Sequence, residues 1–339
     1  MRWSRTLTVV GCHTGGEVGD VVVGGLGKVS GSTMFEKRLY LEEHLDQIRR
    51  LLLFPPRGSV IRSVNFVLPS TNPDAEFGYV IAETTEYPAM SGSNTICTAT
   101  VLLETGMIPM VEPETHLVLE SPAGLISLTC ECLDGKVTSV RFVNQPAFVY
   151  QLDQVVEVPG YGSVRVDVAW GGMAYALVQA SDLGFSLEPA EAAELCRVGQ
   201  LVKSAAAEQI PTVHPLEPRY AGITQTEFTG PLRREEGVLV SQNAVIVSPG
   251  RIDRSPCGTG TSARLAVLHA RGQIEVGETF VHESLIGSRY LGRIESLTEV
   301  GDLPAVVPSI AGAAHLTSIA QVGLDPSDPF PLGYELADV

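Results

Sequence analysis

The sequence predicts an α/β protein built from two similar domains that face each other across a cleft. Short runs of alternating apolar and polar residues, which are typical of strands, fill much of the chain. A loop that enters a helix through a Ser/Cys-Gly motif occurs twice, and a helical segment precedes each copy. The length of 339 residues also favours two domains over one.

The composition is that of a packed, acidic protein. Hydrophobic residues make up 44% of the chain and charged residues 18%, the opposite of the balance found in disordered proteins. The formal net charge of −16 disfavours nucleic acids and anionic membrane surfaces as partners, because both carry dense negative charge. The chain shows neither a membrane-spanning apolar run nor the apolar stretch of a signal peptide. We therefore expect a soluble, cytoplasmic protein that acts on a small molecule.

Hydrophobic periodicity predicts the individual elements. Alternating runs predict strands at 6–10, 21–23, 59–67, 116–120, 126–132, 137–143 and 244–247. Apolar residues at helical spacing predict one helix over 36–54, which Pro55 and Pro56 end, and another over 186–205, which Ser186 is expected to cap.

Two shorter predicted helices resemble each other in sequence. Residues 90–108 align with residues 256–274, so that Ser91 matches Cys257. Each copy ends in a glycine at the place where a helix C-cap glycine belongs, Gly106 in the first. The simplest interpretation is a duplicated α/β unit.

The start of each repeated helix is suited to binding an anion. Free N–H groups in the first turn of a helix bind carboxylates, and the positive end of the helix dipole lowers the pKa of a thiol. Two such helix starts could hold a small carboxylate from opposite sides, with Ser91 and Cys257 facing each other across it. Gly258 and Gly260 would let the ligand approach the backbone closely.

Three further roles are conceivable for these segments. The pattern Gly258-x-Gly260-x-x-Ala263 fits a dinucleotide-binding fingerprint, but residues 248–256 separate it from the preceding predicted strand. Ser91 taken alone is equally well understood as an ordinary N-cap, because serine is a preferred capping residue. A Ser–His–Asp hydrolase is disfavoured because no serine lies in a G-x-S-x-G motif.

The cysteines outside this motif indicate neither disulfides nor a metal. The chain has six cysteines, too few for a disulfide framework in a protein of this length. Cys130 and Cys132 form a C-x-C pair, but no second cluster completes a zinc site. We expect every cysteine except Cys257 to act as a small buried apolar residue.

Several motifs resemble those of the proline racemase family. Residues 253–263, DRSPCGTGTSA, look like the second signature of that family, and residues 90–95, MSGSNT, are similar to the first. Residues 13–17, HTGGE, match its N-terminal motif, although Val18 stands where the family usually has proline. Further likeness occurs at 171–173, at 284–288, and at Pro308 with Gly312. The resemblance thus covers nearly the whole chain.

The resemblance implies a fold and a domain division. Family members consist of two pseudo-symmetric α/β domains of the proline racemase and diaminopimelate epimerase type. Each is a curved mixed sheet around a central helix, and the active site lies in the cleft between them. We expect a first domain over 1–145 that carries Ser91 and to which 311–339 returns, and a second over 146–310 that carries Cys257.

The resemblance also implies roles for particular residues. Racemases and epimerases of the family use one cysteine on each face of the substrate Cα; Cys257 matches the second, and Ser91 stands in place of the first. Ser93 stands where many members have histidine. Positions that bind the substrate's carboxylate and ring nitrogen match Gly92, Ser93, Asp253, Gly258 and Thr259. Family members need no cofactor, and we expect neither a cofactor nor a metal here.

Serine at position 91 bears on which reaction to expect. A serine hydroxyl can donate a proton to a carbanion, but without an activating neighbour it is a poor base. Dehydration of trans-3-hydroxy-L-proline needs one strong base only, because the hydroxyl and the Cα hydrogen lie on the same ring face. We therefore expect a hydro-lyase that forms Δ1-pyrroline-2-carboxylate from trans-3-hydroxy-L-proline.

Two further functions stay open at this point. A hydroxyproline 2-epimerase would convert trans-4-hydroxy-L-proline to cis-4-hydroxy-D-proline, either alone or as a second activity of the same site. A non-catalytic hydroxyproline-binding protein would have lost one base, although the intact motif around Cys257 argues against it. The expected partner is in each case a small molecule, hydroxyproline. The sequence leaves the oligomeric state open, a homodimer included.

Overall fold

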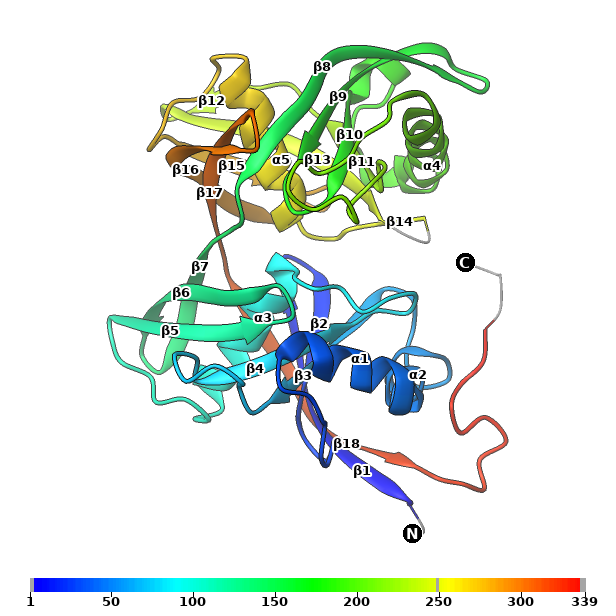
Figure 1. Ribbon diagram of the computed structural model, residues 1–339, viewed down its shortest axis with the longest axis vertical. Helices are drawn as coiled ribbons and strands as arrows, with labels where there is room; N and C mark the ends of the chain where they lie inside the picture. Colours follow the sequence, from blue (N-terminus) through cyan, green and yellow to red (C-terminus); the bar gives the residue numbers. More distant parts are fainter. Residues whose placement is uncertain (1–2, 248–249, 336–339) are drawn as a thin grey trace. The chain divides into compact units, whose positions relative to one another are not determined.

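The computed structural model describes residues 3–247 and 250–335, and these form two compact units. Unit 1 comprises the described residues up to Phe142 and from Ala313 onward, and unit 2 those from Val143 to Gly312. Each unit contains a mixed sheet, one helix buried against the sheet and further helical segments on its other face (Figure 1).

The sheet of unit 1 runs in the order β18, β1, β2, β3, β4, β5, β6, β7. The β2–β3 and β4–β5 pairs are parallel and the others antiparallel. The bounds are β1 Arg5–Thr14, β2 Glu17–Gly24, β3 Arg62–Leu68, β4 Phe77–Ala82, β5 Glu114–Ser121, β6 Gly124–Leu133, β7 Lys136–Val143 and β18 Ala314–Leu324.

The sheet of unit 2 repeats this order with β8, β9, β10, β11, β13, β15, β16 and β17. Its parallel pairs, β10–β11 and β13–β15, fall at the same places, and β17 pairs back to β8, so this sheet closes on itself. The bounds are β8 Ala147–Val158, β9 Gly162–Trp170, β10 Ala174–Gln179, β11 Gln225–Thr229, β12 Arg233–Glu235, β13 Val238–Val247, β14 Arg251–Ile252, β15 Thr279–Glu283, β16 Arg289–Val300 and β17 Leu303–Gly312. The short strands β12 and β14 pair with β13.

The two repeated helices are the buried ones. Helix α3, Gly92–Glu104, packs on β1, β2, β3 and β18, and helix α5, Gly258–Ala270, packs on β8, β9, β10, β16 and β17. A helix surrounded by protein has no polar face, and small hydroxyl residues supply most of the polar side chains of both helices. The hydroxyls of Thr98 and Ser262, for example, donate to carbonyls four residues back. The predicted curved mixed sheet around a central helix is confirmed.

The ends of these helices also agree with the sequence prediction. Gly106 and Gly272 have left-handed backbone conformations, with φ of +74° and +65°. Their N–H groups donate to the carbonyls of Leu103 and His269 in the last helical turn. Glycine adopts this conformation without the steric cost that other residues incur.

The outer helices differ from prediction in two details. The stretch predicted as one helix forms α1, Met34–His44, and α2, Asp46–Leu53, because the backbone of Leu45 leaves the helical region. Asp46 starts the second helix and is held there by Arg49, with Nε 2.6 Å from Oδ1.

Ser186 is not the cap of the helical segment that follows it, so that prediction was wrong. The first turn, η2 Pro189–Glu191, is closed by a capping box between Glu188 and Glu191 and leads into α4, Ala192–Gln209. The amide of Ser186 instead donates to the carboxylate of Glu191. The Glu191 carboxylate binds these N–H groups in place of the Ser186 hydroxyl because a carboxylate accepts hydrogen bonds from several N–H groups at once.

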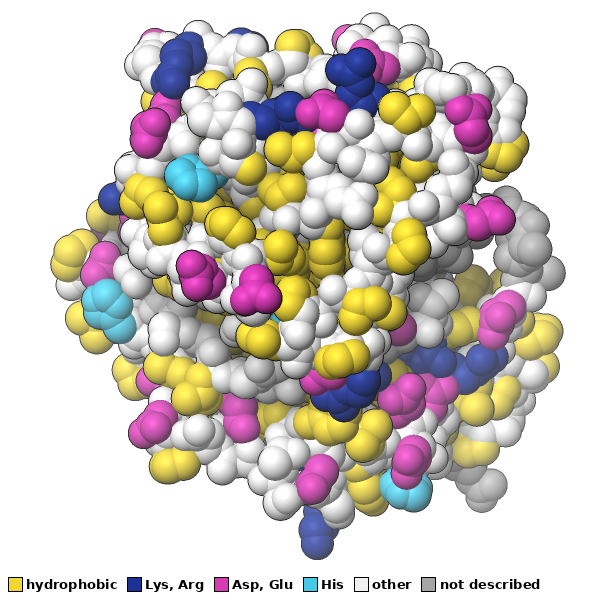
Figure 2. Space-filling view, turned by 45° about the horizontal axis from the view of Figure 1, so that its top comes forward, with side chains coloured by type: hydrophobic (Ala, Val, Ile, Leu, Met, Phe, Trp, Pro, Cys, Tyr) yellow, Lys and Arg dark blue, Asp and Glu magenta, His cyan; other side chains and the backbone are white. Residues whose placement is uncertain are grey.

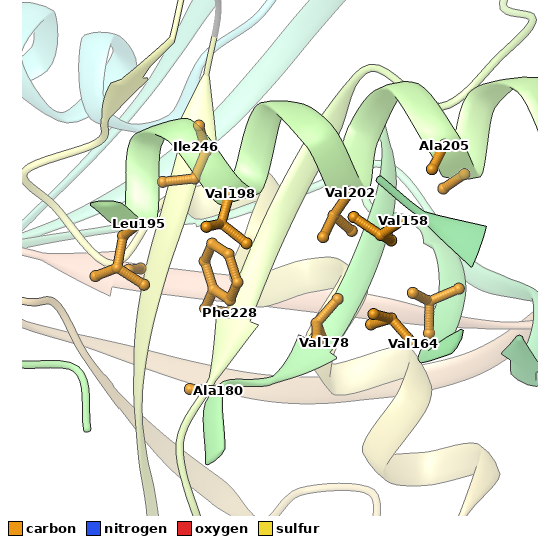
Figure 3. Packing of buried hydrophobic residues seen from close by; sticks show 14 of the residues in the cluster. Val158, Val164, Val178, Ala180, Leu195, Val198, Val202, Ala205, Phe228 and Ile246 are labelled. Atoms are coloured by element: carbon orange, nitrogen blue, oxygen red, sulfur yellow. The ribbon is translucent and has the colours of Figure 1, made fainter. Parts of the chain in front are cut away.

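The apolar face of α4 packs against the outer side of the unit 2 sheet. Figure 3 shows Leu195, Val198 and Val202 of α4 against Phe228 of β11 and Ile246 of β13. These residues are almost completely buried. The sheet of unit 2 is therefore covered by α4 on one side and by α5 on the other, which leaves α5 shielded from solvent.

The acidic side chains do not gather in one place on the face shown in Figure 2, where they lie among basic, apolar and uncharged groups. No helix within the described ranges is long and apolar enough to cross a membrane.

Candidate active site

In unit 1, Ser91 lies directly before α3 with an extended backbone, φ −151° and ψ 129°. Its hydroxyl does not cap the helix. Instead, Ser91 Oγ accepts a hydrogen bond from Asn94 Nδ2 at 3.1 Å and lies 3.2 Å from Ser93 Oγ. Neither partner is a base, so these contacts do not activate the serine as one.

Asn94 is itself fixed by two residues of β3. Its Oδ1 accepts from Ser63 Oγ at 2.8 Å and from Asn65 Nδ2 at 2.9 Å. Asn94 is 2% exposed. The Ser91 group (Ser91, Gly92, Ser93 and Asn94) is therefore a neutral hydrogen-bonded network at the N-terminus of α3.

In unit 2, Cys257 takes the same place before α5. Its Sγ accepts a hydrogen bond from the N–H of Gly260 at 3.4 Å. Its φ of +64° is unusual for a residue other than glycine, and such strained conformations cluster at functional sites. The backbone geometry thus marks Cys257 as more than a capping residue.

Two hydroxyl groups surround the sulfur. Tyr175 Oη lies 3.4 Å from Cys257 Sγ, and Thr259 Oγ1 lies 3.5 Å from it. The two hydroxyls also contact each other at 2.6 Å. Both can donate hydrogen bonds to a thiolate.

Sequence reasoning missed Tyr175. Tyr175 lies on β10, two residues after the family-like segment 171–173. That segment packs tightly on α5, because a Cβ at Gly171 would lie 2.1 Å from the Thr259 carbonyl oxygen. The family-like motif at 171–173 indicated that this stretch lies near the site. It did not indicate that the Tyr175 side chain would reach the Cys257 thiol.

Asp253 is linked to Cys257 through Ser255. Asp253 Oδ1 accepts from the backbone N–H and the hydroxyl of Ser255, at 2.9 and 2.8 Å, and Ser255 Oγ accepts from the Cys257 N–H at 3.1 Å. The aspartate therefore shapes the loop before α5, as a turn-forming aspartate does. It is 9% exposed, so its charge is felt strongly by its neighbours.

The environment of Cys257 raises the pKa of its thiol to about 12. Burial is the main cause and the negative charge of Asp253 the second, and together they outweigh the hydrogen bonds from Tyr175, Thr259 and Gly260. From the position of Cys257 at a helix start, we expected the helix dipole to lower this pKa. The structure reverses the sign because Cys257 is only 7% exposed.

The structure brings the sequence-predicted residues together in two sets. Gly92 and Ser93 lie with Ser91 at the start of α3, and the Cys257 group gathers Asp253, Ser255, Cys257, Gly258, Thr259 and Tyr175 around the start of α5. Gly260 was expected to admit a ligand. The absence of a side chain at Gly260 also makes room for Glu227, whose Oε2 would lie 2.9 Å from a Cβ at that position.

The described part of the chain contains no cluster of histidine, cysteine or acidic side chains arranged to hold a metal ion. Glu227 and His282 of unit 2, whose Oε1 and Nε2 lie 3.5 Å apart, form a pair without a third such group and are completely buried.

Comparison with known proteins places this geometry in context. The family model described as Proline racemase matches residues 9–335. A hydroxyproline epimerase from Agrobacterium vitis, solved with bound trans-4-hydroxy-L-proline, is 39% identical with a TM-score of 0.89, and the match covers 100% of this chain and 97% of that one. A probable proline racemase from Agrobacterium radiobacter K84 with bound carbonate is also 39% identical, with a TM-score of 0.88 and coverage of 98% and 97%.

More distant structures share the fold alone. A phenazine biosynthesis protein of the PhzF family from Bacillus anthracis is 14% identical with a TM-score of 0.59, and the match covers 95% of this chain and 99% of that one.

Proposed function

The chain belongs to the proline racemase family, and we propose that it is a hydroxyproline 2-epimerase that converts trans-4-hydroxy-L-proline to cis-4-hydroxy-D-proline. The observation that carries this proposal is the similarity, over the whole chain, to an epimerase with trans-4-hydroxy-L-proline bound. The comparison therefore favours the reaction that the sequence analysis placed second.

The Cys257 group has the features that a base for Cα needs. The Cys257 thiolate would take the Cα proton, and Tyr175 and Thr259 would donate hydrogen bonds to it. The carboxylate of the substrate would accept hydrogen bonds from the N–H groups at a helix start. These bonds would stabilise the negative charge that builds up on the substrate when the Cα proton leaves.

Substrate binding itself would help to form the thiolate. The negative charge of Asp253 raises the thiol pKa in the substrate-free protein. A positively charged ring nitrogen beside Asp253 would offset that charge and lower the pKa of Cys257. The protein would thus hold a protonated thiol until a substrate arrives.

Ser91 would act as the donor on the opposite face of Cα. Its hydroxyl gives a proton to the carbanion, which completes the inversion, and the resulting alkoxide and thiol return to hydroxyl and thiolate by exchange of one proton through solvent. The two groups are unequal acids, so Cys257 takes the Cα proton from the L epimer far more readily than Ser91 takes it from the D epimer.

A second candidate activity, dehydration of trans-3-hydroxy-L-proline, is favoured by one observation. Ser91 contacts only the neutral side chains of Ser93 and Asn94, so it has no partner that makes it a strong base. In dehydration, Cys257 alone would take the Cα proton and return it to the departing hydroxyl as water leaves. The enamine product would tautomerise to Δ1-pyrroline-2-carboxylate.

Incubation with single isomers tests both activities. The protein should convert trans-4-hydroxy-L-proline to the cis-D isomer, detected by chiral chromatography. Imine formation from trans-3-hydroxy-L-proline, detected with o-aminobenzaldehyde, would add dehydration as a second activity. In D2O the D product should carry deuterium at Cα, because Cys257 takes the Cα proton, whereas the Ser91 hydroxyl, which has exchanged with solvent, gives a deuteron. If neither isomer reacts while both bind, the protein is a binding protein and the enzymatic proposal is wrong.

A further inference from the structure

Behind the Cys257 group lies a buried carboxyl that the proposed mechanism does not use. Glu227, in the middle of β11, is fully buried. Neither of its carboxyl oxygens has a well-formed hydrogen bond in the described part of the chain. The polar side chains that face it are Asn243 of β13 and His282, whose Nε2 lies 3.5 Å from Glu227 Oε1 and also lacks a hydrogen bond. Buried polar atoms without partners are costly and rarely occur without a reason.

This carboxyl lies against the turn that holds the thiol. The point where Gly260 would carry a Cβ is 2.9 Å from Glu227 Oε2 and 3.3 Å from Cys257 Cβ. Glu227 Oε2 and Cys257 Cβ are therefore no farther apart than these two distances added together. The N–H of the same glycine, Gly260, donates to Cys257 Sγ.

Unit 1 has a neutral pair at the equivalent place. Strand β3 occupies the same place in the sheet of unit 1 as β11 does in unit 2. Asn65 of β3 contacts Asn94, the third residue after Ser91. In the same way, Glu227 of β11 lies against Gly260, the third residue after Cys257. Amides do not titrate, whereas a carboxyl does. The position behind the helix start thus carries an amide in unit 1 and an ionisable carboxyl in unit 2.

We propose that Glu227 is a positioning residue that tunes Cys257: the gain or loss of its proton sets how readily the thiol ionises, and gives the Cys257 group a pH response that the Ser91 group lacks. The proposal rests on the role in proton transfer proposed above for Cys257. A negative charge at Glu227 would add to that of Asp253 and oppose thiolate formation, whereas a neutral Glu227 would not.

The groups that face Glu227 allow its carboxyl to change charge near neutral pH. Burial raises its pKa to about 8, against the opposing effects of the Arg264 guanidinium on α5 and of the Asn243 side chain on β13. From β15, His282 faces it as a neutral group, since burial lowers the histidine pKa well below its usual value. From β10, Tyr175 stays protonated because burial raises its pKa.

The remaining neighbours of β11 add no charge at this point. On β13, the uncharged Asn243 donates to the carbonyl of Pro256 in the loop before Cys257. Helix α4 packs on the other face of β11, where Thr226 donates to the Gly199 carbonyl. Glu227 is therefore the group expected to titrate behind the thiol between pH 7 and 9.

Alkylation of Cys257 by iodoacetamide, followed by peptide mass spectrometry from pH 6 to pH 10.5, tests the proposal in the unmodified protein. The logarithm of the rate should rise with pH, flatten as Glu227 ionises near pH 8, and rise again. A straight line through this range would overturn the proposal. This measurement needs no variant, so a folding defect cannot obscure it.

Substitution identifies the group responsible. Glu227→Gln should remove the flat region, leave the rate at pH 6 unchanged, and speed alkylation at pH 10 on the order of tenfold. Glu227→Asp should keep a flat region, because it keeps a titrating carboxyl. Glu120→Gln, which removes a carboxyl that is 9% exposed in unit 1, is the matched control and should keep the unmodified profile. A flat region that survives in Glu227→Gln would assign it to another group and refute the proposal.

The outcome is separable from that of the proposed function. Alkylation uses no substrate, so the pH response of the thiol can be present even if no hydroxyproline isomer reacts. If it is present without activity, the inference about Glu227 stands and the enzymatic proposal fails. If turnover is observed but the alkylation profile is straight, the enzymatic proposal stands and the inference about Glu227 fails.

Discussion

Tyr175 Oη lies 3.4 Å from Cys257 Sγ in a completely buried setting on the inner face of β10. Burial raises the pKa of the tyrosine well above its usual value, so the hydroxyl keeps its proton and can donate it in a hydrogen bond to a thiolate. This contact lowers the thiol pKa against the larger effect of burial. It joins two residues whose roles can be measured separately from substrate binding.

Tyr175→Phe should raise the pKa of Cys257, because it removes a donor to the thiolate while the ring stays in place. We expect alkylation and turnover at pH 8 to fall on the order of tenfold, since a charge-assisted hydrogen bond contributes about 1.5–3 kcal/mol. Tyr79→Phe is the matched control: Tyr79 is equally buried in unit 1, and its hydroxyl contacts Thr95 at 2.6 Å. Equal effects of the two substitutions would mean that the loss comes from packing.

Cys257→Ser should abolish both candidate reactions while the protein stays folded, because the two side chains are nearly equal in size and only the thiol is a competent base. A fall in kcat on the order of a thousandfold or more is expected, measured by chiral chromatography beside circular dichroism. Cys196→Ser removes a half-buried thiol of α4 and should leave activity unchanged. Activity retained in Cys257→Ser would remove the thiol from the mechanism.

Asp253→Asn should have opposite effects on two measurements. The loss of a negative charge lowers the thiol pKa, so alkylation of Cys257 in the free protein should become faster. Turnover should fall and KM should rise, because the ring nitrogen would lose the counter-charge that we propose Asp253 to supply. Asparagine can still accept from Ser255 and keep the turn, so the loop should be preserved. If both measurements stay unchanged, Asp253 has only its role in the turn.

Substitutions at Ser91 should change the balance between the two candidate reactions. Ser91→Cys supplies a second thiol and should raise epimerisation of 4-hydroxyproline relative to dehydration of trans-3-hydroxyproline. Ser91→Ala should abolish epimerisation, because it removes the proton donor that we propose for the second face of Cα. The Ser91 hydroxyl does not cap α3, so neither substitution should unfold the helix. A ratio that is the same in all three proteins would show that position 91 does not control the reaction.

Local patterns made the repeated helices predictable. The N-terminal motifs at Ser91 and Cys257 and the terminal glycines, Gly106 and Gly272, act within a single helix. The segment 253–263 was specific enough to indicate the family, which the match over residues 9–335 confirms. The break at Leu45 escaped prediction because it depends on how Asp46 is held, with Tyr87, 41 residues along the chain, donating to its carboxylate.

The sequence by itself determined that a thiol stands at the start of α5 and a hydroxyl at the start of α3, because residue identity and helix position are local properties. Only the tertiary structure decided how strong an acid that thiol is. Tyr175 reaches Cys257 across 82 residues of sequence, and Glu227 reaches Gly260 through the position of β11 in the sheet. A pKa sums burial, charges and hydrogen bonds from every strand around the helix, which is why the local prediction of a lowered value had the wrong sign.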